Sequence, residues 1–265
     1  GLNWYEYCTG NPNRYIDPDG RENIIVAGGI YSKSKKDAGK YYYEFIDTAL
    51  KEAYILKGRN FFEKTTVFVA KAGYTDNDIK GIKEIAEMLD VNLIMFTDTE
   101  ELIDYINNGS DNNRAEDRIK RFSVFSHGFA PNGNAGSIEF AHSTGLDSDS
   151  TKKLSLTIDK IKNGKLKEEA FDDTSSMFYS CNTGTGDEKN SFAQNWVNIT
   201  GGTTTAAIGS TYYGVINDRK GYEIEWAGYR AMRAIYGRGY SSPFMSFKFP
   251  ELSKNATWKY FKKVE

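Results

Sequence analysis

The feature that most constrains the fold is a regular alternation of short apolar runs, rich in β-branched residues, with stretches whose apolar residues recur at helical spacing. The apolar runs are NIIVAGGI (23–30), TTVFVA (65–70), VNLIMF (91–96), RFSVFSH (121–127), SSMFYSC (175–181) and TTTAAIGS (203–210). Buried strands read as continuous apolar runs, and strands separated by helices imply crossover connections in a mostly parallel sheet. The alternation therefore predicts an α/β fold: a three-layer α/β/α sandwich around a mostly parallel central sheet.

Helices are predicted between these strands, over residues 36–57, 76–89 and 188–199. Another helix is expected to begin at Thr99, with two glutamates in its first turn, where the helix dipole favours negative charge. These helices would cover the two faces of the sheet.

Two regions break the alternation. A long polar excursion follows His127, with weak strand signals at 137–141 and 154–158 and a short helix expected at 165–171. An excursion of this kind at the edge of a sheet is typical of a functional loop or a small inserted hairpin. Farther on, TYYGVI (211–216) and YEIEW (222–226) predict a second hairpin, and the chain closes with a basic tail, ATWKYFKKVE.

The composition argues against several classes of partner and cofactor. The 265 residues carry 34 Lys and Arg against 36 Asp and Glu, a net charge of −2, so no global basic field exists to hold a nucleic acid, and we expect no nucleic-acid partner. No run approaches the roughly 18 apolar residues of a membrane-spanning helix, and the first residues lack a signal-peptide pattern, so we expect no membrane partner and no export signal in the chain itself. The only histidines are His127 and His142, which excludes a multi-histidine metal site, and we expect no metal and no cofactor.

Residues 1–22 differ from the rest of the chain. They are rich in Tyr, Asn, Gly and Pro, with turn signals at 10–13 and 17–20, and they cannot bury their own side chains. The run LNWYEYCTGNPNRYIDPDGRE (2–22) resembles the end of the core region of RHS-repeat proteins, whose shell usually closes with a Tyr-rich N-P-x-x-Y-x-D-P-x-G segment. The resemblance implies that residues 23–265 form a C-terminal toxin domain, delivered into the cytoplasm of a target cell and neutralised by a cognate immunity protein, with the RHS shell as its parent.

Candidate catalytic residues follow two of the predicted strands. One ends in Ser-His-Gly at His127 and Gly128, and the other in Ser-Cys-Asn at Cys181. Ligands of open parallel sheets bind beyond the carboxyl ends of the strands, so adjacent strands would bring a thiol nucleophile beside its base. The backbone N–H groups of Gly128 and Cys181 would then form an oxyanion hole, in which one donor contributes roughly 3 to 4 kcal/mol.

Each of these residues could also have a purely structural role. A cysteine at the end of an apolar strand is commonly a buried core residue, and a lone histidine is often structural. Their joint occurrence at two strand ends favours chemistry. His142 in the polar excursion and Cys8 in the leader are interpreted as incidental.

The pair resembles a second family, the caspase-like cysteine peptidases, over residues 23 to 211. Carried over residue by residue, the resemblance implies that His127 is the catalytic base, Gly128 an oxyanion donor and Cys181 the nucleophile, with a protein or peptide as substrate. The chain departs from the family at Ser180, where many members have Ala. The resemblance also implies that a helix with buried Phe192 and Trp196 packs behind the nucleophile strand.

Three alternatives stay open. An α/β-hydrolase would need a nucleophile elbow and a histidine after the nucleophile, and this chain has neither. A toxin nuclease would need metal-ligand spacing that is absent. A caspase-like binding module with an unreactive Cys181 is the non-enzymatic alternative. For a peptidase, the acidic pair Asp187 and Glu188 hints at cleavage after Lys or Arg.

Overall fold

The computed structural model describes most of the chain. The described residues are 21–32, 41–60, 63–130, 136–142, 144–163, 165–186, 191–214 and 247–264. The expected leader lies outside them, except for Arg21 and Glu22, which occupy the first two positions of strand β1.

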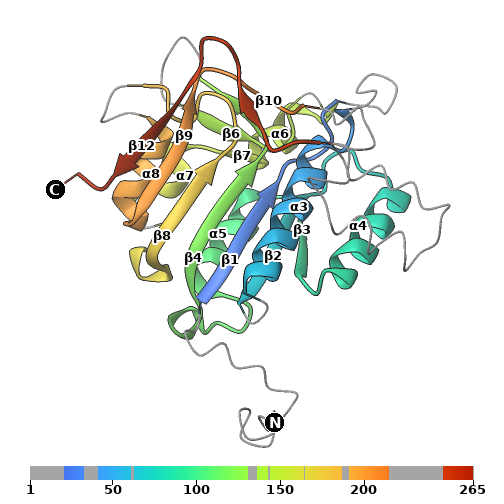
Figure 1. The fold of residues 1–265 in the computed structure, drawn as a ribbon, viewed down its shortest axis with the longest axis horizontal. Helices are drawn as coiled ribbons and strands as arrows, with labels where there is room; N and C mark the ends of the chain where they lie inside the picture. Colours follow the sequence, from blue (N-terminus) through green and yellow to red (C-terminus); the bar gives the residue numbers. More distant parts are fainter. Residues whose placement is uncertain are drawn as a thin grey trace, which may run out of the picture.

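The centre of the fold is a seven-stranded sheet with the order β12-β9-β8-β4-β1-β2-β3 (Figure 1). Its strands are β1 (Arg21–Ala27), β2 (Lys64–Ala70), β3 (Asn92–Phe96), β4 (Arg118–Phe125), β8 (Phe171–Phe178), β9 (Thr203–Ile208) and β12 (Thr257–Lys262). All neighbouring pairs are parallel except β12 with β9, which is antiparallel. The predicted α/β fold with a mostly parallel sheet is confirmed.

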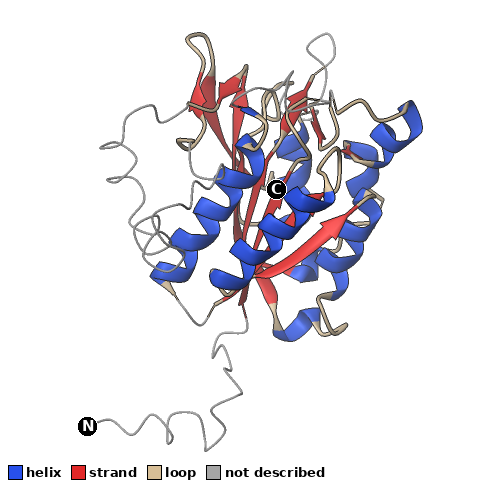
Figure 2. Ribbon diagram, turned by 90° about the vertical axis from the view of Figure 1, so that its right-hand side faces the viewer, coloured by secondary structure: helices blue, strands red, loops and turns tan. Residues whose placement is uncertain are grey.

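Helices lie on both faces of this sheet (Figure 2). The main ones are α3 (Glu44–Arg59), α4 (Asp76–Met88), α5 (Thr99–Asn108) and α8 (Phe192–Thr200). Because side chains alternate along a strand, β1 divides its residues between two cores: Ile25 packs with α3 and α4, and Ile24 packs with α5 and α8. We refer to these as the α3 face and the α8 face.

Capping side chains stabilise the first turns of several of these helices. Thr75 and Asp98 each form a capping box, and Ser191 accepts a hydrogen bond from the Gln194 N–H at the start of α8. Side-chain caps of this kind satisfy backbone N–H groups that the first helical turn leaves unpaired. The prediction that a helix begins at Thr99 is confirmed.

The polar excursion contains a second, three-stranded antiparallel sheet. Its strands are β5 (His127–Phe129), β6 (Ser137–Glu139) and β7 (Ser155–Leu156), in that order. The two weak strand signals are thus confirmed as β6 and β7. The single strand predicted through residue 127 is wrong, because the chain bends at Ser126 and His127 pairs with Glu139 of the small sheet instead.

Short helical turns fill the rest of the excursion: α6 (Ser148–Lys153), α7 (Ile158–Ile161) and the 3-10 turn η4 (Glu168–Ala170). The helix expected at 165–171 is therefore only a single turn. Strand β8 begins at Phe171, earlier than predicted, because Phe171 is buried and pairs with Ile119 of β4.

The C-terminal part of the chain departs further from expectation. Strand β10 (Thr211–Tyr212) pairs with β11 (Glu251–Leu252), whereas residues 222–226, its expected partner, lie outside the described residues. The basic tail forms β12 at the sheet edge. No helix in the described ranges combines the length and the apolar character that a membrane span requires.

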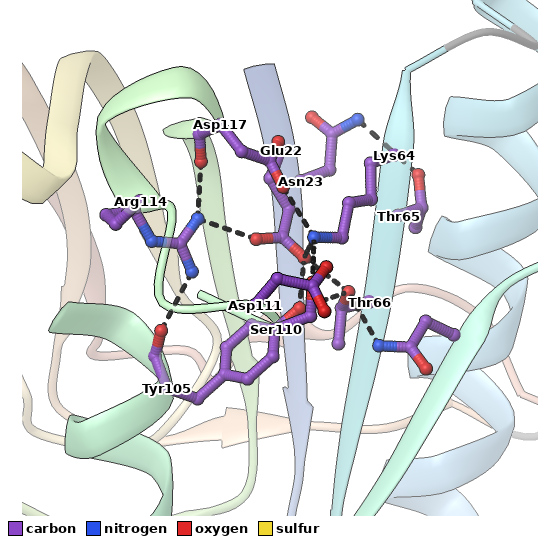
Figure 3. A network of polar contacts seen from close by, with 11 residues as sticks. Glu22, Asn23, Lys64, Thr65, Thr66, Tyr105, Ser110, Asp111, Arg114 and Asp117 are labelled. Carbon is purple, nitrogen blue, oxygen red and sulfur yellow. Dashed lines mark hydrogen bonds and ion pairs between the residues drawn. The ribbon is translucent and has the colours of Figure 1, made fainter. Parts of the chain in front are cut away.

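A network of charged and polar side chains closes the amino-terminal edge of the sheet (Figure 3). Its centre is Glu22, which is fully buried and accepts hydrogen bonds from Arg114 (2.7 Å) and from the Tyr105 hydroxyl (2.8 Å). Lys64 lies 3.7 Å from the same carboxylate. Arg114 belongs to the 3-10 turn η2 (Arg114–Glu116), so the network joins β1, β2, α5 and η2 at the edge opposite to the strand ends that carry the candidate catalytic residues.

Candidate active site

The strands that carry the two candidate catalytic residues are neighbours in the sheet. In the parallel pair β4 and β8, Val124 lies opposite Phe178, and the Tyr179 N–H donates to the Val124 carbonyl at 3.0 Å. Just beyond these strand ends the backbones of Gly128 and Cys181 lie in direct contact, since a Cβ atom at Gly128 would come 1.9 Å from the Cys181 carbonyl oxygen. Strands β4 and β8 are therefore adjacent, as the sequence pattern predicted.

The His127 side chain lies on the α3 face of the sheet. Phe125 and Tyr179, two positions earlier on each strand, stack with ring centroids 4.5 Å apart. Phe125 belongs to the buried cluster of the α3 face, and Tyr179 packs against that cluster. The contact of the His127 ring with Phe45 of α3, at 4.9 Å, agrees with this placement.

The His127 imidazole is largely enclosed by aromatic rings. Its ring centroid lies 5.3 Å from that of Tyr31 and 5.1 Å from that of His142. Burial, with a smaller effect from His142, lowers the pKa of His127 to about 4, against the opposing effect of a hydrogen bond to the Tyr31 carbonyl. The imidazole is therefore neutral at physiological pH.

A backbone carbonyl sets the tautomer of this imidazole. Nε2 of His127 lies 3.4 Å from the Tyr31 carbonyl oxygen, which can only accept a hydrogen bond. Nε2 therefore carries the proton and Nδ1 is free to accept one. A base oriented by a third group in this way is typical of a nucleophile–base pair.

The Cys181 thiol is held by Thr211, just beyond β9. The Thr211 N–H donates to Sγ at 3.3 Å, and Sγ lies 3.6 Å from the Thr211 carbonyl oxygen. The Thr211 hydroxyl in turn donates to the Tyr179 carbonyl at 2.7 Å. The thiol thus meets both a backbone donor and a backbone acceptor of the same residue, which fix its position.

Among the described residues no hydrogen bond joins Cys181 to His127. The two side chains share Tyr31 as a neighbour. Its ring lies beside His127, and the pKa of its hydroxyl is raised by burial and, to a smaller extent, by the charges of Glu44, Tyr41 and Cys181. Catalytic hydrogen bonds are often long before substrate binds and shorten in the complex. The geometry places the two groups around one site without a direct bond between them.

Gly128 lies directly against the backbone of Cys181. A Cβ atom at Gly128 would come 1.9 Å from the Cys181 carbonyl oxygen and 2.8 Å from its nitrogen, which excludes any side chain here. The Cys181 N–H has no hydrogen-bond acceptor in the part of the chain that the structure describes. It is thus available to an oxyanion, while the donor role of Gly128 stays a prediction.

The serines that precede the two candidates are buried. Ser126 is 2% exposed and donates to the Glu139 carbonyl at 2.9 Å, and Ser180 is fully buried. Neither hydroxyl is placed to attack a substrate, which leaves the Cys181 thiol as the nucleophile candidate.

The segment after Cys181 turns sharply back toward the sheet. Asn182 has φ 58°, in the left-handed region, and its N–H donates to the Gly209 carbonyl at 2.8 Å. Helix α8 then packs behind β8 with Phe192 and Trp196 fully buried, as the resemblance to caspase-like peptidases implied. Asp187 and Glu188, the expected specificity residues, lie outside the described residues, as does Cys8.

Sequence reasoning missed several residues of the site. Tyr31 and Thr211 follow β1 and β9, so their place beyond the carboxyl ends of strands was the available signal. His142 was interpreted as incidental, yet its ring lies beside His127 because the small sheet folds the excursion back over the site. No local pattern in the sequence indicates that return.

Among the described residues, no three His, Cys, Asp or Glu side chains gather closely enough to hold a metal ion. Comparisons with protein-family models, with curated protein sequences and with solved structures gave no match to this chain. Function is therefore inferred from the site itself.

Proposed function

We propose that the chain is a cysteine endopeptidase of the caspase-like type, with Cys181 as nucleophile and His127 as general base. The observation that carries the proposal is that the two residues follow the carboxyl ends of adjacent parallel strands, where the backbone of Gly128 lies against that of Cys181. The tautomer set by Tyr31, the thiol held by Thr211 and the free Cys181 N–H support it.

The reaction uses these groups in two stages. As Sγ of Cys181 bonds to the substrate carbonyl carbon, the thiol proton moves to Nδ1 of His127, and the carbonyl oxygen becomes an oxyanion near the Cys181 N–H. His127 then returns the proton to the departing amine, leaving an acyl-enzyme. Water, deprotonated by the same imidazole, releases the acid and restores the thiol.

The low pKa of His127 fits this sequence of events. A neutral imidazole is ready to accept a proton at any pH above about 4. Its basicity rises once a thiolate forms beside it, because an opposite charge favours the imidazolium. Proton transfer is thus coupled to attack on the substrate.

We further propose that this peptidase is the toxin domain of an RHS-type protein and acts in the cytoplasm of a target cell on a protein substrate. The support is the resemblance of residues 2–22 to the end of an RHS core, and it implies a cognate immunity protein and a parent shell as partners.

One experiment separates the peptidase from an inert binding module. Expression in a bacterium should slow growth for the natural chain and for Cys8→Ser, which keeps the nucleophile, but not for Cys181→Ala. Iodoacetamide should label Cys181 in the Cys8→Ser protein, and His127→Ala should slow that labelling by about 100-fold, the usual contribution of a general base. Equal toxicity of the natural chain and Cys181→Ala, or labelling indifferent to His127, would contradict the proposal.

A further inference from the structure

A cavity of about 270 Å³ lies between helix α3 and strands β4 and β8. Its helical wall is one stripe of α3, formed by Glu52, Ile55, Leu56 and Arg59. Residues at this spacing share one side of a helix. At roughly 30 Å³ for each water molecule, the volume suits an organic compound of about ten non-hydrogen atoms.

The opposite wall of the cavity is the surface of the sheet. Arg121 of β4 lies beside Ser175 of β8, and Ser123 lies beside Met177 in the next pair of the same face. Tyr179, just beyond β8, continues this row of alternate residues. The register of two parallel strands therefore fixes the positions of the groups that face α3.

The apolar part of the lining consists of two rings and three aliphatic side chains. The ring of Phe249 lies 6.1 Å from that of Tyr179, and Ile55, Leu56 and Met177 supply the aliphatic surface. Burial of an apolar ligand body against such a surface is favourable, because it removes carbon from water.

The polar part of the lining has hydrogen-bonding groups that the described chain does not use. The Glu52 carboxyl group accepts a hydrogen bond from the Ser123 hydroxyl at 2.7 Å through Oε1, whereas its Oε2 is buried and has no partner among the described residues. Within the same part of the chain, neither Arg59 nor Arg121 has a hydrogen-bond or ion-pair partner. Two guanidinium groups at one cavity can bind a carboxylate through their paired N–H donors.

We propose that this cavity binds a small carboxylic acid with an apolar body, whose carboxylate is held by Arg59 and Arg121. The body of the ligand packs on the rings of Tyr179 and Phe249. Neither candidate catalytic residue lines the cavity, so the site goes beyond the proposed peptidase activity and would be present in a catalytically inert chain as well.

A proton on Glu52 keeps this side chain from repelling the carboxylate of the ligand. Burial raises the pKa of Glu52 to about 7, against the lowering effects of the Ser123 hydrogen bond and of the charges of the two arginines. The remaining titratable group of the lining is the Tyr179 hydroxyl, whose pKa is raised by burial and by Glu52, so that it stays neutral near pH 7. The segment at Phe249 adds no charged group to the lining.

The test measures Kd by isothermal titration calorimetry for three probes at pH 6. Phenylacetate should bind at least about 10-fold more tightly than phenylacetamide, which has the same shape without the charge. It should bind about 30-fold more tightly than acetate, which has the charge without the ring. Equal affinity for phenylacetate and phenylacetamide, or no binding of phenylacetate, would overturn the proposal.

Variants locate the binding site. Arg121→Met should weaken phenylacetate binding by about 10-fold, because it removes one of the two guanidinium groups. Arg118→Met is the matched control on the same strand, since Arg118 pairs with Asp172 at 3.3 Å and does not line the cavity, and it should leave Kd unchanged. Met177→Trp should fill the cavity and abolish binding, and a thermal melt shows whether this variant is folded. Equal losses with Arg121→Met and Arg118→Met would mean that the ligand responds only to overall charge and would overturn the assignment.

The pH dependence of Kd tests the role of Glu52. With a pKa of about 7, the protonated fraction of Glu52 falls from about 90% at pH 6 to about 10% at pH 8. Phenylacetate should therefore bind about 10-fold more tightly at pH 6 than at pH 8. Glu52→Gln, which is neutral at both values, should bind at pH 8 as tightly as the natural chain does at pH 6. A 10-fold dependence that persists in Glu52→Gln would contradict the role of this side chain.

Discussion

At the scale of the residue, His127 shows how its surroundings determine the charge of a candidate catalytic group. Enclosure by Tyr31 and Phe45 removes water from the imidazole, and His142 adds a like charge nearby. Both lower the pKa, from 6.5 to about 4. Because the unfolded chain binds this proton first, stability due to the neutral imidazole is lost as pH falls from about 6.5 through about 4.

The pH dependence of kcat/KM should follow this value. With a pKa near 4, about 90% of His127 is in the neutral form at pH 5, whereas about 3% of a histidine with a pKa of 6.5 would be neutral. His142→Ala should move the acid limb to higher pH but not to 6.5, because burial, the larger cause, remains. An acid limb with an apparent pKa near 6.5 in the natural protein would show that solvent reaches the imidazole.

At the scale of the element, strand β12 shows how the basic C-terminal segment of the sequence becomes part of the sheet. It pairs antiparallel with β9 along its whole length, and Phe261 points into the core while Tyr260 points to solvent. The Lys262 carbonyl accepts a hydrogen bond from Gln194 of α8 at 2.8 Å. The strand therefore holds α8, which packs behind β8, in place.

Two neighbouring substitutions in β12 should have very different effects. Phe261→Ala removes a ring that is 2% exposed and should lower the free energy of unfolding by about 3 to 5 kcal/mol. Tyr260→Ala, at a ring that is 56% exposed, should cost less than about 1 kcal/mol. Urea denaturation measures both. Similar losses would mean that β12 is not packed on the core as described.

At the scale of the whole molecule, the buried polar network and the candidate active site lie at opposite edges of one sheet. The network of Figure 3 binds the start of β1 to β2, α5 and η2 through Glu22 and Arg114, whose side chains are 0% and 5% exposed. The candidate active site lies at the carboxyl ends of the strands. A change in the network should therefore alter stability and leave the site unchanged.

Arg114→Met tests this separation. It leaves Glu22 buried with a poorer set of partners and should lower the free energy of unfolding by about 3 to 5 kcal/mol. Lys152→Met, which breaks the exposed pair with Asp149, should change it by less than about 0.5 kcal/mol. Under conditions where both variants are folded, the iodoacetamide rate at Cys181 should match that of the natural protein, and a slower rate with Arg114→Met alone would contradict the separation.

The sequence by itself determined the α/β class, the main helices and the two buried strands that His127 and Cys181 follow. These features depend on local properties: apolar periodicity, capping residues such as Thr75 and Asp98, and polar residues that follow a buried run. Each is readable within a window of a few residues, because the forces that set it act between near neighbours.

Only the tertiary structure decided what surrounds those two residues. Strand order placed β4 beside β8, and the small sheet carried His142 back to His127. Each outcome depends on pairing and desolvation between residues far apart in the chain. Such interactions leave no periodicity in the sequence, since they are determined by which surfaces meet when the whole sheet is packed.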